Sequence, residues 1–321
     1  SDRDKKGKER PWELHKIKTI LLSESYKRLG LIKKAYRVEE CGIYLEFKRF
    51  VKDNVLKLKG ANFCYARLCP MCAWRRSLKI FGQVSKVMNK ALDLKDFRFL
   101  FLTLTVKNAE GNVLKETLDN RFKSYNKLFQ RKQIKGSIKG WFRALEVTHN
   151  LDKDSKNYDT YHPHFHVILM VNKSYFNKPE QYISQEKWIN LWKESLGVDY
   201  DPVVDVRAFK ANSKKQVQKS VAEAAKYTVK DNDYLVEGNE ELTDSAVEVL
   251  EYALARRRLT AFGGLLKEIH KELNLDDVEK GDLINTDNDE ELREDVDYII
   301  ERYKWSVGYN QYLKLFMERV P

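Results

Sequence analysis

The chain has 321 residues, and 59 Lys or Arg against 48 Asp or Glu give it a formal net charge of +11. Its apolar fraction of 42% suffices for a packed core and excludes a wholly disordered chain. No apolar run approaches the ~18 residues that span a bilayer, no signal-peptide pattern opens the chain, and four cysteines are too few for a secreted disulfide scaffold. These features predict a soluble, cytoplasmic protein without a membrane partner.

The charge is distributed unevenly along the chain. Residues 271–297 contain twelve acids and three bases, a net charge of −9, which leaves +20 on the other residues. A basic excess of this size attracts polyanions, of which nucleic acid is the commonest. Charge alone also fits a solvated surface that binds nothing specific. We expect the acidic segment to contact a partner or to shield basic surface when no DNA is bound.

The predicted elements indicate an α+β fold. The first ~18 residues are polar and predict an arm, alternation at 43–47 suggests a strand, and 74–94 has helical periodicity. Strands are then predicted over 97–106, 141–149, 164–171 and 203–209, and helices over 114–133, 182–196 and 213–230. Ser213 and Gln216 fit a capping box. The order β-α-β-β-α-β, then a helix, is the ferredoxin-like, split βαβ arrangement with an antiparallel sheet.

Beyond residue 234 the pattern is weaker. It suggests helices near 244–258 and 265–273, then an acidic loop, then aromatic strand-like sequence at 303–313.

Three of the six histidines lie within five residues of one predicted strand. His164 and His166 stand at i and i+2 and project from the same face, where two imidazoles form a bidentate site for Mn, Zn, Co or Ni. Glu146, an acid among apolar residues of the preceding strand, would be a third ligand if the strands are neighbours. The alternatives are histidines hydrogen-bonded at a sheet edge and an acid paired with a lysine. His162, just before Pro163, fits a ligand, a substrate contact or a loop residue.

A second group of polar residues lies in the last predicted helix of the core. Glu223, Tyr227 and Lys230 stand at i, i+4 and i+7 and predict one stripe of that helix. With its ordinary pKa of about 10, tyrosine is a poor nucleophile, but a metal that polarises a phosphodiester and a nearby cation make its attack feasible. The alternative is an ordinary helical tyrosine, since the chain has 17 of them.

All four cysteines lie within 32 residues, at Cys41, Cys64, Cys69 and Cys72. The Cys-Pro-Met-Cys hook at 69–72 is typical of a zinc ribbon, and four thiolates form a closed tetrahedral Zn²⁺ site. A disulfide fits a reducing cytosol less well, and no thioredoxin-like pattern surrounds the hook. Cys41 is the weakest member because its spacing is long. The basic flank of Arg67, Arg75 and Arg76 suggests that this part touches DNA.

Several motifs in this order carry a family resemblance. They are FLTLT at 101–105, HPHFHV at 162–167, Glu223 with Lys226, Tyr227 and Lys230, and in support RLCPMCAWRR at 67–76 and FGG at 262–264. Together they resemble the HUH endonuclease superfamily. Within it, nearly the whole chain resembles the rolling-circle replication initiators of small Gram-positive plasmids that have one catalytic tyrosine and a helical glutamate.

The resemblance implies an enzyme that nicks one strand of a double-strand origin, at a single-stranded or extruded hairpin site, and stays attached to the 5′ phosphate. Tyr227 would be the nucleophile. His164 and His166 would hold Mn²⁺ or Mg²⁺, with Glu146 as third ligand and His162 as a further candidate. Glu223 would activate water at termination, where a second transesterification is the other route, and Lys230 would place the scissile phosphate or the metal. A UvrD-type host helicase is an implied partner, and a homodimer is a further expectation.

The resemblance also suggests how the chain is divided into parts, and it leaves other functions to compare. The predicted parts are a basic N-terminal arm (1–35), a Cys-rich zinc-binding and DNA-contacting part with its helix (36–95), an HUH nuclease core (96–232) and a C-terminal helical and strand region (233–321). Competing functions are a single-Tyr HUH transposase or relaxase, a non-enzymatic zinc-dependent DNA-binding protein such as a repressor, and a zinc hydrolase. Covalent trapping of DNA separates the first of these from the other two.

Overall fold

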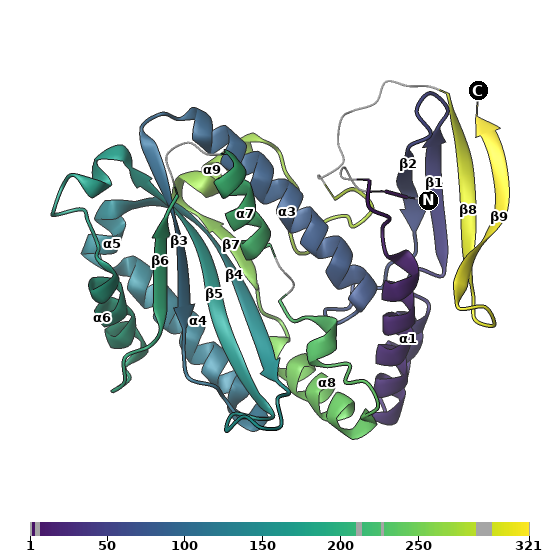
Figure 1. Cartoon of the computed structure of the whole chain (residues 1–321), viewed down its shortest axis with the longest axis horizontal. Helices are drawn as coiled ribbons and strands as arrows, with labels where there is room; N and C mark the ends of the chain where they lie inside the picture. Colours follow the sequence, from purple (N-terminus) through teal and green to yellow (C-terminus); the bar gives the residue numbers. More distant parts are fainter. Residues whose placement is uncertain (1, 4–6, 210–213, 226–227, 287–296, 321) are drawn as a thin grey trace. The chain divides into compact units, whose positions relative to one another are not determined.

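The structure is a computed structural model that describes residues 2–3, 7–209, 214–225, 228–286 and 297–320 (Figure 1). Its contacts divide the chain into two compact units, each assembled from separate segments. The first unit comprises Ser1–Gly82, Tyr234–Glu248 and Lys280–Pro321, and the second comprises Gln83–Asp233 and Val249–Glu279. Two helices, α3 (Pro70–Asp93) and α8 (Glu240–Leu254), contribute residues to both units. These units divide the chain differently from the four consecutive parts that the sequence suggests.

The second unit is built on a five-stranded antiparallel sheet in the order β6-β3-β5-β4-β7. Its strands are β3 (Phe97–Thr105), β4 (Ile138–Asn150), β5 (Thr160–Asn172), β6 (Val204–Ala208) and β7 (Thr260–Gly263). The central β5 runs antiparallel to β3 on one side and to β4 on the other, while β6 pairs with the free edge of β3. This is the order of a split βαβ arrangement. The predicted α+β class with an antiparallel sheet is confirmed, and β7 is an additional edge strand.

Helices cover both faces of this sheet (Figure 1). They are α4 (Leu114–Gln130), α5 (Lys132–Ser137), α6 (Gln185–Leu196), α7 (Lys214–Ala224) and α9 (Gly264–Glu272), with short 3-10 turns at Gly111–Val113, Lys173–Phe176 and Asp231–Asp233. The ring of Phe165, in the middle of β5, packs against Phe122 and Tyr125 of α4. Residues two apart on a strand share a face, so this packing turns the neighbouring histidines to the opposite face, where α7 contacts β5.

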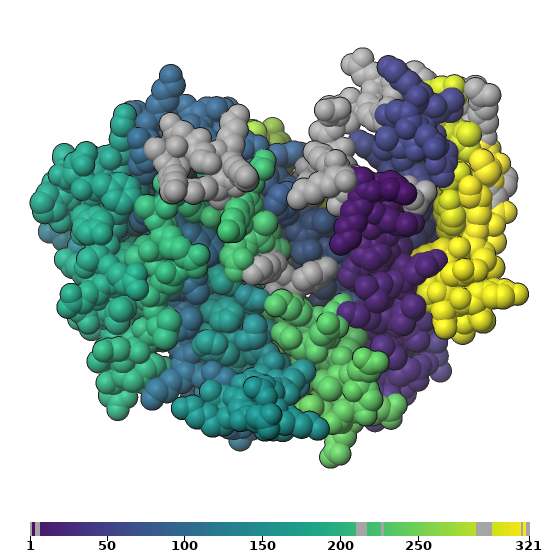
Figure 2. Space-filling view, viewed as in Figure 1, coloured from purple at the N-terminus to yellow at the C-terminus, as the bar shows by residue number. Residues whose placement is uncertain are grey.

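The first unit holds a four-stranded antiparallel sheet in the order β2-β1-β8-β9. Its strands are β1 (Tyr44–Phe50), β2 (Leu56–Ala61), β8 (Tyr298–Ser306) and β9 (Gln311–Val320). The last strand, β9, is an edge strand and lies at the surface (yellow in Figure 2). The sequence suggested only two short parts of this sheet, because its two hairpins lie more than 200 residues apart and pair only in the folded chain.

The N-terminal arm predicted from the sequence is wrong from residue 12 onward. The structure forms α1 (Trp12–Arg28) and α2 (Ile32–Glu39) there. The side chains of Trp12, Leu22 and Tyr26 are buried. The apolar residues of α1 are not confined to one face, since Leu14 and Leu21 are exposed, so its amphipathic pattern is weak. Tertiary packing, rather than periodicity, stabilises this helix. No helix in the described part of the chain is both long and apolar enough to cross a membrane.

Two adjacent glycines bring β7 against β4. A Cβ on Gly263 would collide with the indole of Trp141, and Gly264 has a left-handed φ of +54° with the carbonyl of Lys139 against the position of its missing Cβ. Both positions therefore require the absence of a side chain. This gives a physical reason for the FGG motif at 262–264, which in the sequence was only a supporting part of the family resemblance.

One buried ion network ties β1, β8 and β9 together. Glu301 is 1% exposed, and its carboxylate is bonded by Arg49, by Lys314 and by the Tyr303 hydroxyl, all at 2.8–2.9 Å. Burial raises the pKa of Glu301, but these donors outweigh it and lower the pKa to about 2. The carboxylate therefore stabilises the folded state above its ordinary pKa of 4.5, and this contribution is lost as the pH falls toward 2.

We expect Glu301→Gln to lower the free energy of unfolding by ~2–3 kcal/mol at neutral pH, because it leaves Arg49 and Lys314 without their anion. Urea unfolding at pH 7 and pH 3 checks this, since the difference from the unmodified protein should shrink at the lower pH. Glu318→Gln, on exposed β9 sequence, is the matched control. An equal loss at both pH values would show that charge plays no part in the effect.

Candidate active site and cysteine cluster

The histidine strand and the glutamate strand are neighbours. In the β4–β5 register, Glu146 lies opposite His164 and Ala144 opposite His166. One carboxylate oxygen of Glu146 is 2.7 Å from Nε2 of His166 and 3.2 Å from Nε2 of His164. A ligand atom from each of the three residues lies within 4.8 Å of the others. The structure thus brings together the three residues that the sequence proposed as one site.

The electrostatics of this cluster suit a cation. Burial raises the pKa of Glu146, but hydrogen bonds from His164 and His166 outweigh it and hold that pKa well below the usual range. The two Nε2 atoms lie close to the same anionic oxygen, so a cation would sit between these three donor atoms. Two imidazole nitrogens and one carboxylate oxygen form a donor set that fits a divalent metal such as Mn²⁺, and the carboxylate extends the choice to Mg²⁺.

His162 lies on the same face of β5, since Thr148 is its partner in the register with β4. Its ring meets that of His164 edge to face at 5.1 Å, and burial, then the charge of His164, lower its pKa. The structure places His162 on the strand rather than in the loop, beside the three-residue cluster. It remains a candidate ligand or substrate contact.

A buried arginine holds this part of β5 in place. The guanidinium of Arg121, on α4, donates to the main-chain carbonyls of Pro163 and Leu104. It lies over the ring of Phe165, with its central carbon 5.0 Å from the ring centre. Burial lowers its pKa to about 9. Arg121 therefore fixes β3 and β5 next to the histidines, and the sequence showed no signal for it because it resembles any other helical arginine.

The stripe predicted from Glu223, Tyr227 and Lys230 is wrong at its C-terminal end. The helix α7 ends at Ala224, so Glu223 is in its last turn while Lys230 lies beyond it and is exposed. The chain turns away because Val229 is buried and the carbonyl of Thr228 accepts a hydrogen bond from the backbone N–H of Val147, at 2.7 Å. Tyr227, with Lys226 and the capping residue Ser213, lies outside the described residues.

The residues that follow position 227 are anchored beside the cluster. Val147, which binds Thr228, is adjacent in sequence to Glu146. Further along, Nδ1 of His149 is 2.8 Å from the carbonyl of Asp233, and its Nε2 is 2.7 Å from the carboxylate of Asp159. These contacts attach the segment 228–233 to β4. Sequence reasoning missed His149, since a lone strand histidine carries no spacing signal.

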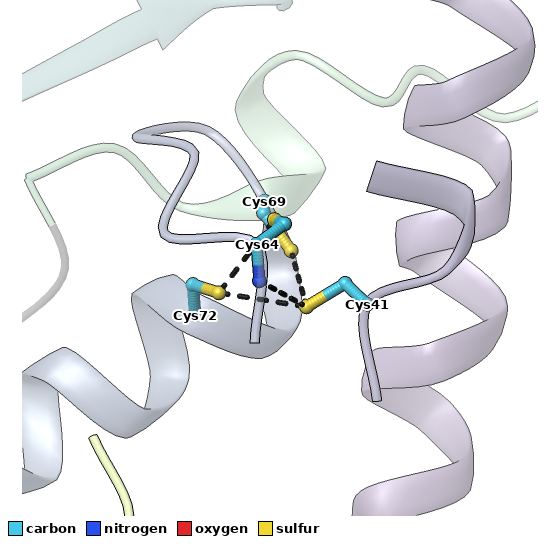
Figure 3. A group of neighbouring side chains, drawn as sticks. All are labelled: Cys41, Cys64, Cys69 and Cys72. Carbon is cyan, nitrogen blue, oxygen red and sulfur yellow. Dashed lines mark hydrogen bonds between the residues drawn. The ribbon is translucent and has the colours of Figure 1, made fainter. Parts of the chain in front are cut away.

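The four cysteines converge in the first unit (Figure 3). Cys69 and Cys72 come from the start of α3, Cys41 follows α2 and Cys64 follows β2. Sulfur–sulfur distances are 3.5 Å for Cys41–Cys72, 3.7 Å for Cys64–Cys72 and 3.6 Å for Cys69–Cys41. All four sulfurs lie within 4.8 Å of one another, and Cys41, the member with the longest spacing, is among them. Four thiols around one point form the donor set of a tetrahedral metal site.

The thiols shift one another's pKa in opposite directions. Hydrogen bonds to the other cysteines, with burial, raise the pKa of Cys41 well above the ordinary value, and burial raises that of Cys72 likewise. Burial raises the pKa of Cys69, but hydrogen bonds from the other three thiols outweigh it and lower that pKa well below the ordinary value. The buried ammonium of Lys16, on α1, donates to the carbonyls of Glu39 and Cys41 at 2.5 and 2.8 Å. Burial lowers the pKa of Lys16, and the neighbouring sulfur charges oppose that shift. The sequence did not suggest Lys16, since it lies 25 residues before Cys41.

Comparison with known proteins identifies the family. A family model described as "Replication protein" (Rep_1) matches residues 55–313. The chain is similar to a "Protein rep" of Bacillus amyloliquefaciens, at 42% identity over 97% of this chain and 96% of that protein. A Bacillus sp. "Protein rep" is 46% identical over 78% and 84% of the two chains, and one of Streptococcus pneumoniae is 42% identical over 90% and 88%. No solved structure gives a significant match. The resemblance inferred from the motifs is thereby confirmed, and the chain belongs to this family of replication proteins.

Proposed function

We propose that this replication protein initiates rolling-circle plasmid replication as an HUH endonuclease. It would nick one strand at the double-strand origin and remain joined to the 5′ phosphate. The observation that carries the proposal is the meeting of Glu146, His164 and His166 on adjacent strands, with a ligand atom of each within 4.8 Å of the others. A replication protein has no evident structural need for two histidines that share one buried carboxylate, whereas a phosphodiester-cleaving enzyme does.

The catalytic cation would be Mn²⁺ or Mg²⁺, held by Nε2 of His164, Nε2 of His166 and the carboxylate of Glu146. Such a cation polarises the scissile phosphodiester and offsets the charge that develops on its oxygens. The chain itself supplies the rigid donor set, because Arg121 and the β4–β5 ladder fix the strands that carry it.

The tyrosine would perform the covalent step. The phenolic oxygen of Tyr227 forms a bond to phosphorus while the bond from phosphorus to the 3′ oxygen breaks, and a proton passes from the phenol to the leaving 3′ hydroxyl. The phosphotyrosine keeps the phosphodiester bond energy, so rejoining needs no ATP. Thr228 directly follows Tyr227, and its carbonyl accepts a hydrogen bond from the backbone N–H of Val147 on β4. This bond holds the residue after the proposed nucleophile to the strand that carries Glu146.

Two further residues would assist. Glu223, in the last turn of α7, would activate the water that releases the protein at termination, where a second transesterification is the other route. Lys230, exposed on the segment after the helix, would bind the scissile phosphate by its charge. Since α7 ends before Lys230, the position of the Lys230 ammonium depends on the path of this segment and not on helical spacing.

The cysteine cluster would hold a structural Zn²⁺. Four thiolates with Zn²⁺ carry a charge of −2, and the buried ammonium of Lys16 would balance part of it. The ion would join α2, the segment after β2 and the start of α3, which the sequence separates by up to 31 residues. With four protein ligands, such an ion would have no open position and so would have a structural rather than a catalytic role.

Origin DNA is the partner that the charge supports, since the basic excess supplies affinity for phosphates. The nick site would be single-stranded or an extruded hairpin, because an intact duplex does not expose the phosphate for in-line attack. A UvrD-type helicase and a homodimer stay predictions from the resemblance.

Covalent trapping tests the proposed function. The protein is incubated with a labelled origin oligonucleotide, with and without Mn²⁺, and run on a denaturing gel. We expect a shifted protein–DNA band that needs the metal, with digestion mapping the DNA to the peptide of residue 227. His166→Ala should slow adduct formation by at least ~10³-fold, which corresponds to an activation free energy higher by about 4 kcal/mol.

The matched control is His270→Ala, because His270 lies on α9 and contacts Gln83 and Phe262 instead of the metal cluster. It should keep the adduct. If the protein binds its origin tightly but forms no adduct under any metal condition, the enzyme proposal fails and a non-enzymatic DNA-binding role replaces it.

A further inference from the structure

The four-stranded sheet of the first unit has two chemically different faces. On one face, Leu45, Phe47 and Trp305 are buried, and Trp12 packs edge to face on Phe47 at 5.7 Å. The other face carries the alternate residues, and the β1–β8 register sets Tyr44 opposite Lys304 on it. A strand alternates its side chains between faces, so this second face, called the polar face below, brings together side chains from distant parts of the sequence. Phe50 and Ile300 are its buried apolar members.

Cations dominate this polar face. Five belong to it: Lys48, Lys57, Lys59, Arg302 and Lys304. Lys48 and Lys57 are direct partners in the β1–β2 register, and like charges placed opposite each other are unfavourable in a sheet. Among the described strand residues, the acids on this face are Glu46 and Glu318. Glu46 forms ion pairs with Lys59 at 2.8 Å and with Arg302 at 2.6 Å. The excess of positive charge that the other lysines add would be offset by an anionic partner.

Tyrosines lie among these cations. The side chain of Tyr44 is 50% exposed, and the ammonium of Lys304 lies 5.5 Å from the centre of its ring. The ammonium of Lys48 lies 4.5 Å from the ring of Tyr298, which is half-buried. A ring on a flat sheet with ammonium groups beside it offers stacking to a base and charge to the adjacent phosphates.

We propose that this face binds single-stranded DNA, at a second site separate from the metal cluster. The proposal rests on the proposed function, which supplies an unpaired strand at the nicked origin. A single strand suits the surface better than a duplex, because a duplex keeps its bases stacked inside and leaves the ring of Tyr44 without a partner. The positive charge of the face is complementary to the phosphates of both a single strand and a duplex, so the exposed ring of Tyr44 is what favours the single strand.

Fluorescence anisotropy with labelled oligothymidylate tests the charge component, in buffer without Mn²⁺ or Mg²⁺. The test variant is Lys48→Gln with Lys304→Gln. Its matched control is Lys123→Gln with Lys127→Gln, which removes two exposed lysines from α4, on the side of the nuclease sheet away from the histidines. We expect the sheet variant to bind about tenfold more weakly. Its log–log salt slope should fall by ~1.4, since each phosphate that a lysine no longer neutralises reduces the slope by ~0.7.

The stacking component is tested by Tyr44→Ala, which should weaken binding about tenfold, while Tyr44→Phe keeps the ring and should bind as the unmodified protein does. Unchanged thermal unfolding shows that each variant is folded. Unchanged affinity of the sheet variant, or an equal loss in the α4 control, overturns the proposal. Adduct formation is measured separately, with the labelled origin oligonucleotide and Mn²⁺. Its absence from the unmodified protein contradicts the nuclease proposal, whereas the binding series alone decides the sheet proposal.

Discussion

Replacing Tyr227 with phenylalanine is expected to abolish the covalent protein–DNA adduct. Phenylalanine has no oxygen with which to form the bond to phosphorus, so nicking should fall by at least ~10⁴-fold, about 5 kcal/mol of barrier. Binding of the origin should persist, because the phenol is one group among many that touch the phosphates. A denaturing gel measures the adduct, and anisotropy measures the binding.

The matched control is Tyr252→Phe, since Tyr252 is 65% exposed on α8 and belongs to the same unit. It should nick at the normal rate. An adduct that survives in Tyr227→Phe would mean that another tyrosine is the nucleophile. Since the chain has 17 tyrosines, peptide mapping of that adduct would then identify it.

Replacing Cys72 with serine is expected to abolish binding of the proposed zinc ion and to unfold the first unit. The side chain of Cys72 is fully buried, and its sulfur is within 3.7 Å of two others. Structural zinc contributes ~10–16 kcal/mol of binding free energy in zinc-finger peptides, which exceeds the whole stability of many domains. Elemental analysis should find one zinc per unmodified chain and less in the variant, and thermal unfolding should occur at a much lower temperature.

The matched control is Met71→Leu, at a fully buried neighbour of the hook, which conserves volume and should cost less than ~1.5 kcal/mol. If the variant does not fold, a second measurement on the unmodified protein still tests the zinc site. Modification of its thiols with a mercurial reagent should release one zinc, detected by a chromogenic chelator. Protein that contains no zinc and stays folded in a strong chelator would contradict the structural site.

The sequence predicted most of the five-stranded sheet of the second unit because its signals are local. The buried run at 97–106 and the alternation around His164 each specify a strand within a few residues, and β3 and β5 form there. The hook at Cys69 and Cys72 likewise fits within one turn of helix. Prediction from the sequence failed for α1, where the apolar spacing is weak. It also failed for the end of α7, where the hydrogen bond from the backbone N–H of Val147 to the carbonyl of Thr228 overrides helical periodicity.

By itself, the sequence determined which residues carry chemistry: two histidines on one strand face, four cysteines and a basic excess. Only the tertiary structure decided which of them meet. It placed Glu146 between the two histidines, added Lys16 to the cysteines and formed a cationic face from β1 and β8, over 240 residues apart. The physical reason is that periodicity records how each segment presents its own side chains, whereas register and packing between distant segments depend on the free energy of the whole fold.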